Sequence, residues 1–67
     1  MSFKYKYPIS KTQVGRMNYS YTLRTEMNQW LRTNVGEFNI MWNYSSITGN
    51  YRFRFKRHYT LFILVWG

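Results

Sequence analysis

The chain has 67 residues, which suits one small domain over residues 1–67 with a thin hydrophobic core. Ten Lys and Arg against two acidic residues give a formal net charge of +8, which favours a polyanionic partner. The chain has no cysteine, one histidine (His58) and two separated carboxylates (Glu26 and Glu37). This composition argues against a zinc or calcium site and against nucleophilic catalysis, so we expect no enzyme activity, metal or cofactor.

The first predicted element is a strand at residues 3–7, where aromatic and lysine side chains alternate as Phe-Lys-Tyr-Lys-Tyr. A period of two places the rings on one face of a strand and Lys4 and Lys6 on the other. Pro8 argues against a central strand that continues past it. Residues 8–19 are polar and aperiodic, so we expect a basic loop there, with at most a short helical turn at the capping pattern Ser10-x-x-Gln13.

The next segment predicts a helix, because its apolar residues recur at helical period: Leu23, Met27, Trp30 and Leu31. Ser20 or Thr22 can cap its start, and Gly36 is suited to the left-handed backbone just past its end. The opposite face carries three polar residues at four-residue spacing, which we interpret as solvated surface: Arg24, Asn28 and Arg32.

A hairpin is predicted from two alternating segments, residues 38–44 and 51–56, joined by a turn rich in Ser, Gly and Asn. In the first strand, alternation assigns four side chains to the core: Phe38, Ile40, Trp42 and Tyr44. In the second strand, three aromatic residues face the core: Tyr51, Phe53 and Phe55. The cations between and after them face the other way: Arg52, Arg54 and Lys56.

The course of residues 58–66 stays open at this point. Leu61 to Trp66 is a short apolar run, and its period does not separate a third hairpin strand from a helix. The residues before it, 56–59, lack the Gly, Asn or Asp that a tight turn prefers. The alternatives are a further strand, or a short helix over about residues 58–63 with a brief terminal strand.

The C-terminal quarter combines an aromatic strand with a closing motif of spaced apolar residues: Tyr51-x-Phe53-x-Phe55, then Leu61-Phe62-x-Leu64-x-Trp66-Gly67. This pattern resembles the tail of short, uncharacterised proteins encoded by tailed bacteriophages, in which such a strand leads into a short helix and a final Phe-x-Leu-x-Trp-Gly. The present sequence departs from them at Tyr59-Thr60, where an acidic residue and Ala commonly stand. The resemblance implies a viral origin and no specific activity.

Together these elements predict an α+β fold: a small β-α-β-β sandwich closed by a last helix or strand. One helix packs on an antiparallel sheet, as in half of a ferredoxin-like fold. In that arrangement the first and third strands are neighbours, and their rings lie under the helix. The cations then emerge on the uncovered face, with Arg57 directly after them: Lys4, Lys6, Arg52, Arg54, Lys56 and Arg57.

We interpret these cations as an anion-binding surface, for which two hypotheses compete. The first is binding of nucleic acid, DNA or RNA, through its phosphate backbone. The alternative is an inhibitor or adaptor that docks on an acidic surface of a host protein, such as a nucleic-acid-handling or defence enzyme. The N-terminus shows no apolar signal segment, so we expect a cytoplasmic protein, in the host cytoplasm if it is viral.

Blander interpretations remain beside these two. The charge could serve solubility alone, and a staggered strand register would separate the cations. A membrane surface fits less well, because the cations lie on strands rather than along an amphipathic helix. Self-association, as a homo-oligomer, is another way for so short a chain to bury surface.

Overall fold

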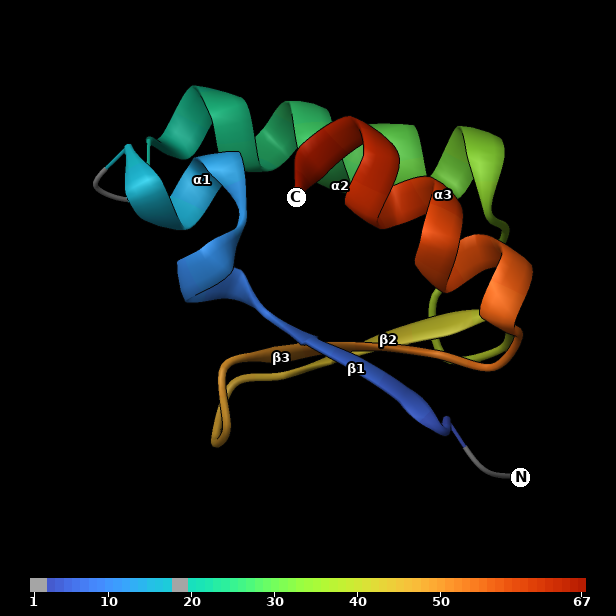
Figure 1. Ribbon diagram of the computed structural model, residues 1–67. Coiled ribbons are helices and arrows are strands. Elements are labelled where there is room, and N and C mark those ends of the chain that lie inside the picture. The colour runs from blue at the N-terminus through green and yellow to red at the C-terminus, as the bar shows by residue number, and fades with distance from the viewer. Residues whose placement is uncertain (1–2, 18–19) are drawn as a thin grey trace.

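The computed structural model describes residues 3–17 and 20–67, which form a sheet layer and a helix layer (Figure 1). The predicted α+β class is confirmed. In chain order the described elements are β1 (Tyr5–Pro8), the 3-10 turn η1 (Ile9–Lys11), α1 (Gln13–Arg16), α2 (Tyr21–Asn34), β2 (Trp42–Ser45), β3 (Asn50–Phe53) and α3 (Lys56–Trp66).

The sheet has the strand order β1-β3-β2, and both pairings are antiparallel. The prediction that the first and third strands are neighbours is therefore confirmed. Tyr5 and Trp42 both pair with Phe53, whereas Tyr7 and Tyr44 both pair with Tyr51. The six rings share one face of the sheet, because side chains two residues apart in a strand point the same way.

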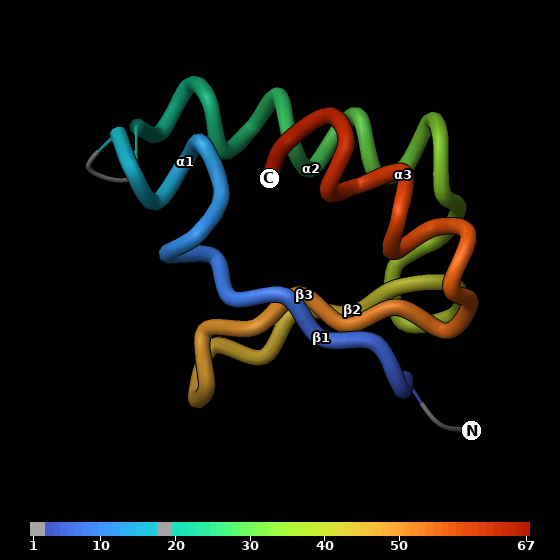
Figure 2. Tube along the Cα trace, viewed as in Figure 1, coloured from blue at the N-terminus to red at the C-terminus, as the bar shows by residue number. Residues whose placement is uncertain are grey.

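The helices cover that aromatic face and leave the other face bare, as the side views show (Figures 1 and 2). The buried core includes Met27 and Leu31 from α2, Phe62 and Trp66 from α3, and Phe53 from the central strand. The sheet thus carries two long helices, where the sequence predicted one and left the second open.

Helix α2 follows the sequence prediction closely. Ser20, rather than Thr22, is its N-cap, and the Ser20 hydroxyl accepts the Leu23 N–H at 3.4 Å. The helix ends at Asn34, and Gly36 continues with a φ of +139°, a region that favours glycine. The last turn is closed by the N–H groups of Val35 and Gly36, which both donate to the Leu31 carbonyl.

Residues 8–17 are more ordered than the predicted basic loop, while residues 18 and 19 of that loop lie outside the described residues. Ile9, Thr12 and Val14 are buried. Thr12, not Ser10, caps the short helix: its hydroxyl donates to the Ile9 carbonyl at 2.6 Å and accepts the Gly15 N–H at 3.3 Å. This segment is therefore part of the core, anchored by one buried polar side chain.

Strand β2 starts at Trp42, so the prediction of a strand over residues 38–44 was wrong in its first half. Asn39 has a φ of +67°, and the N–H groups of Ile40 and Met41 both turn back to the Glu37 carbonyl. The turn breaks the alternation, and Phe38 and Ile40 are 45% and 46% exposed instead of buried.

Strand β3 ends at Phe53, whereas the prediction extended it to residue 56 and placed Phe55 in the core. Phe55 has extended backbone as the N-cap of α3 and is 37% exposed. Helix α3 then runs without a break from Lys56 to Trp66, so the helical alternative is correct for residues 58–63, but the brief terminal strand predicted after them is wrong. Phe62 and Trp66, four residues apart, are both buried, so the apolar run follows helical rather than strand period.

Candidate functional site

The centre of the uncovered sheet face carries two cations directly opposite each other. Lys6 and Arg52 are Cα partners in the β1–β3 pairing, so the register does not stagger them. On its other side Arg52 pairs with Asn43, whose Oδ1 accepts from Arg52 Nη2 at 2.6 Å and from Nε at 3.2 Å. The guanidinium is thus drawn toward β2 and away from Lys6, which separates the two charges.

Two further predicted residues flank this pair at the strand ends. Lys4 is exposed and immediately precedes β1, and Arg54 immediately follows β3. The backbone N–H of Arg54 donates to the Met41 carbonyl at 3.2 Å. A ring also lies close: the Phe3 centroid is 6.0 Å from the Arg52 guanidinium carbon. We call Lys4, Lys6, Arg52 and Arg54 the basic strand residues, because each lies in β1 or β3 or directly adjoins one of these strands in the chain.

Lys56 and Arg57 do not extend the strand, and their predicted place on the sheet face was wrong. They are the first two residues of α3, and both are exposed. Arg54 and Arg57 both approach the Phe55 ring, at 5.8 Å and 4.6 Å from its centroid. The turn into α3 therefore separates the six predicted residues into the four basic strand residues and a pair at the start of the helix.

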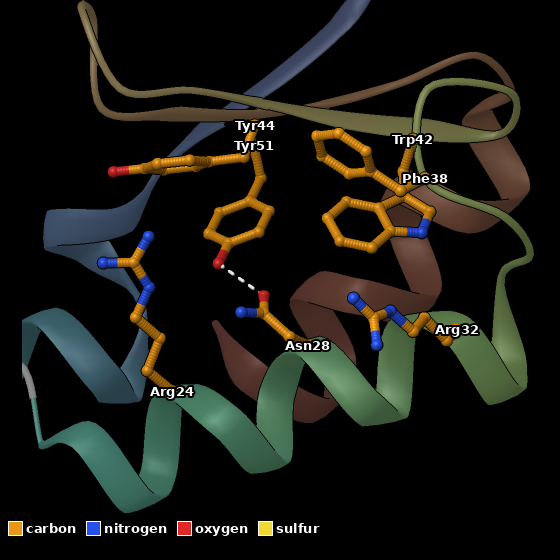
Figure 3. Close-up of a pocket in the computed structure, with 7 residues that line it drawn as sticks. All are labelled: Arg24, Asn28, Arg32, Phe38, Trp42, Tyr44 and Tyr51. Atoms are coloured by element: carbon orange, nitrogen blue, oxygen red, sulfur yellow. Dashed lines mark hydrogen bonds between the residues drawn. The ribbon is translucent and has the colours of Figure 1, made fainter.

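A cleft of about 220 Å³ lies between α2 and the edge of the sheet at β2 (Figure 3). Seven residues line it: Arg24, Asn28, Arg32, Phe38, Trp42, Tyr44 and Tyr51. The interpretation of the first three as a solvated helix face was wrong for Arg24 and Asn28, which are half-buried. Only Arg32 is exposed, and it too lines the cleft.

Several side chains in the cleft are held by their neighbours. The Arg24 guanidinium lies over the Tyr44 ring, 5.1 Å from its centroid. The Tyr51 hydroxyl donates to Asn28 Oδ1 at 3.0 Å (Figure 3). Burial raises the pKa of Tyr51 to about 12, partly opposed by Arg24, so the hydroxyl remains a donor at neutral pH.

The loop that closes one end of the cleft is anchored by a tryptophan. Trp42 Nε1 donates to the Gly36 carbonyl at 2.8 Å, and the Phe38 ring meets the Trp42 ring edge-on with centroids 5.0 Å apart. The four-residue spacing of the polar residues on α2 was visible in the sequence. The turn at residues 38–41, which brings Phe38 opposite those polar residues, could not be predicted, because residues 38–44 alternate as a strand does.

His58 lies half-buried in α3, and its Nδ1 has no hydrogen-bond partner among the described residues. Burial, with a contribution from Arg57, lowers the pKa of His58, so the imidazole is neutral at pH 7. Within residues 3–17 and 20–67, no three His, Cys, Asp or Glu side chains gather as a metal site would require.

Comparison with protein-family models, with curated proteins and with solved structures returned no match. Among the helices of the described residues, none has both the length and the apolar character needed to cross a membrane.

Proposed function

We propose that this protein binds nucleic acid by its phosphate backbone, on the uncovered face of the sheet. The observation that carries the proposal is the direct pairing of Lys6 with Arg52 at the centre of that face. Neither carboxylate of the chain lies on a strand beside these cations, because Glu26 lies in α2 and Glu37 in the loop before β2.

Like charges directly across a strand pair destabilise a sheet by a few tenths of a kcal/mol or more. The bonds to Asn43 reduce this penalty by drawing the Arg52 guanidinium toward β2, and an anion that contacts both cations would remove what remains. The two bonds to Asn43 hold the Arg52 guanidinium in place and leave its other N–H donors to meet a phosphate oxygen. Because the helices lie on one side of the sheet, the other side can contact an extended polyanion without movement of a helix.

The likeness of the C-terminal quarter to small phage proteins supports a viral origin, with the nucleic acid met in the host cytoplasm. Of the α3 residues that carry this resemblance, Phe62 and Trp66 are buried and pack in the core, whereas Leu64 is 78% exposed. The two buried residues stabilise the fold, and we assign binding to the basic strand residues.

A salt series tests the proposal. Labelled single-stranded and duplex oligonucleotides are titrated with the protein from low to physiological salt. Contacts by the four basic strand residues predict a log–log slope of about −3 on single strands and about −3.6 on duplex. A slope near −4 on single strands would mean that about two cations besides the basic strand residues contact phosphates, with Lys56 and Arg57 as one candidate pair.

No binding at low salt by the folded protein would overturn the proposal and favour the alternative, docking on an acidic host protein. One observation speaks for that alternative: Leu61, Leu64 and Val65 of α3 are exposed, and Arg57 lies one turn before Leu61. An apolar stripe with a cation at its end suits a protein surface better than a phosphate backbone.

A further inference from the structure

We propose that the cleft between α2 and β2 holds the base of one unstacked nucleotide, so that the nucleic acid bound by this protein is single-stranded. This inference rests on the proposed function and adds to it a second site and a preferred substrate. The site lies on the helix side of the sheet, between the sheet and α2 (Figure 3). The alternation of side chains along β1 and β3 places Lys6 and Arg52 on the other face.

The lining of the cleft suits one base, with the sugar and phosphates outside at the rim. The cleft of about 220 Å³ is smaller than the pockets of roughly 300–1,000 Å³ that enclose drug-sized ligands, so it has room for the base but not for the whole nucleotide. Its walls supply aromatic rings, two guanidinium groups and one side-chain amide, and the lining includes no Asp or Glu. Flipped-out bases are recognised by these same groups, through stacking on rings or guanidinium planes and bonds to the base edge.

The two arginines stand at opposite ends of the cleft. Arg24 and Arg32 are eight residues apart on α2, a rise of about 12 Å along the helix. They are therefore placed to meet separate phosphates on either side of a base rather than one shared anion. Arg24 is already ordered by its contact with Tyr44, whereas the exposed side chain of Arg32 makes no hydrogen bond to another described residue.

Asn28 lies midway between the arginines and is oriented for recognition of a base edge. Its Oδ1 is occupied by the Tyr51 hydroxyl, which leaves the two N–H donors of Nδ2 for a carbonyl or ring-nitrogen acceptor. Phe38, at 45% exposed, offers ring surface for stacking, and its edge-on contact with Trp42 fixes its position. A base can thus be stacked and hydrogen-bonded in one place.

The geometry favours a single strand, because a base inside a duplex cannot reach such a cleft without leaving the stack. A single strand can also reach both sites. Tyr44 points into the cleft and its neighbour Asn43 belongs to the uncovered face, where it binds Arg52. A backbone that follows the basic strand residues therefore meets the cleft by passing the edge of one strand, β2.

The test compares binding of a labelled ten-nucleotide oligothymidylate and a ten-base-pair duplex by the wild-type protein and two variants, Arg32→Gln and Phe38→Ala. Both positions are exposed, so the variants are expected to fold. We expect each change to weaken single-strand binding about tenfold, as loss of a stacking or phosphate contact does, and to leave duplex binding unchanged. Arg16→Gln, an exposed arginine on α1, removes the same charge and should leave single-strand binding within about twofold.

The outcomes separate the two proposals. If oligothymidylate binds with the expected salt dependence but Arg32→Gln and Phe38→Ala bind it as the wild type does, the cleft inference is wrong and the proposed function stands. Loss equal to that of Arg16→Gln would also overturn it. If neither nucleic acid binds at low salt, both fail. As a direct probe, adenosine 5′-monophosphate should shift the Asn28 side-chain amide resonance, and inorganic phosphate at the same concentration should not.

Discussion

Replacing Phe62 with alanine is expected to leave the chain unfolded at 25 °C. Phe62 is fully buried at the centre of the ring cluster, with centroids 5.0 Å from Phe53, 5.4 Å from Tyr51 and 6.0 Å from Tyr7. It joins α3 to both β1 and β3. Truncating a buried Phe to Ala costs about 3–5 kcal/mol, and the core of a chain this short rarely supplies more than about 3–5 kcal/mol in total.

The measurement is a thermal melt followed by circular dichroism. Leu64→Ala is a matched control, because Leu64 lies two residues away in the same helix and motif but is 78% exposed. Its melt should stay within about 4 °C of the wild type, since surface substitutions change stability by about 0.5 kcal/mol or less. A cooperative melt of Phe62→Ala close to that of the wild type would contradict the described core.

Reversing the charge of both central cations, Lys6→Glu with Arg52→Glu, is expected to weaken nucleic-acid binding at least about 100-fold at low salt. A hydrogen bond to a charged group is worth about 1.5 kcal/mol or more, so each lost phosphate contact costs about tenfold in affinity. The introduced carboxylates then repel the backbone. Stability should fall by no more than the loss of the Arg52–Asn43 hydrogen bonds, because one like-charge pair replaces another across the same strand register.

The control for this double variant is Lys11→Glu with Arg16→Glu, two exposed residues of η1 and α1 on the helix side of the sheet. It makes the same change in net charge and should lower affinity by much less, because its cations are not placed on the binding face. Binding is measured by fluorescence anisotropy with one labelled single strand. Equal losses in the two double variants would mean that net charge, and not the sheet face, governs binding.

The sequence predicted the parts of this fold in which local pattern and tertiary packing agree. The apolar stripe of α2 and its glycine stop are local signals that were confirmed, and of the two candidate caps, Ser20 and Thr22, the structure uses Ser20. The pairing of β1 with β3 was also predicted, from the order strand, helix, strand, strand of a ferredoxin-like half, and alternation then placed the rings and the cations on opposite faces. Lys6 and Arg52 were therefore placed correctly from the pattern alone.

Two features could not be predicted because a pattern imitated the wrong structure. Residues 38–41 alternate as a strand does, yet the positive φ of Asn39 turns the chain and exposes Phe38. Lys56 continues the alternation of β3 and Arg57 follows it directly, yet the two residues begin a helix, since burial of Phe62 and Trp66 favours helical period. The cleft depends on the turn at residues 38–41, which the sequence did not predict. Of its lining, the sequence therefore indicated only the polar face of α2.

The most direct test of the central claim is a titration of ¹⁵N-labelled protein with a single-stranded oligonucleotide, followed by two-dimensional NMR. The account predicts that the amide resonances of Lys6, Asn43 and Arg52 shift first and most, together with the side-chain amide of Asn28. Shifts confined to Leu61, Leu64 and their neighbours on the outer face of α3, or no shifts at all, would contradict it.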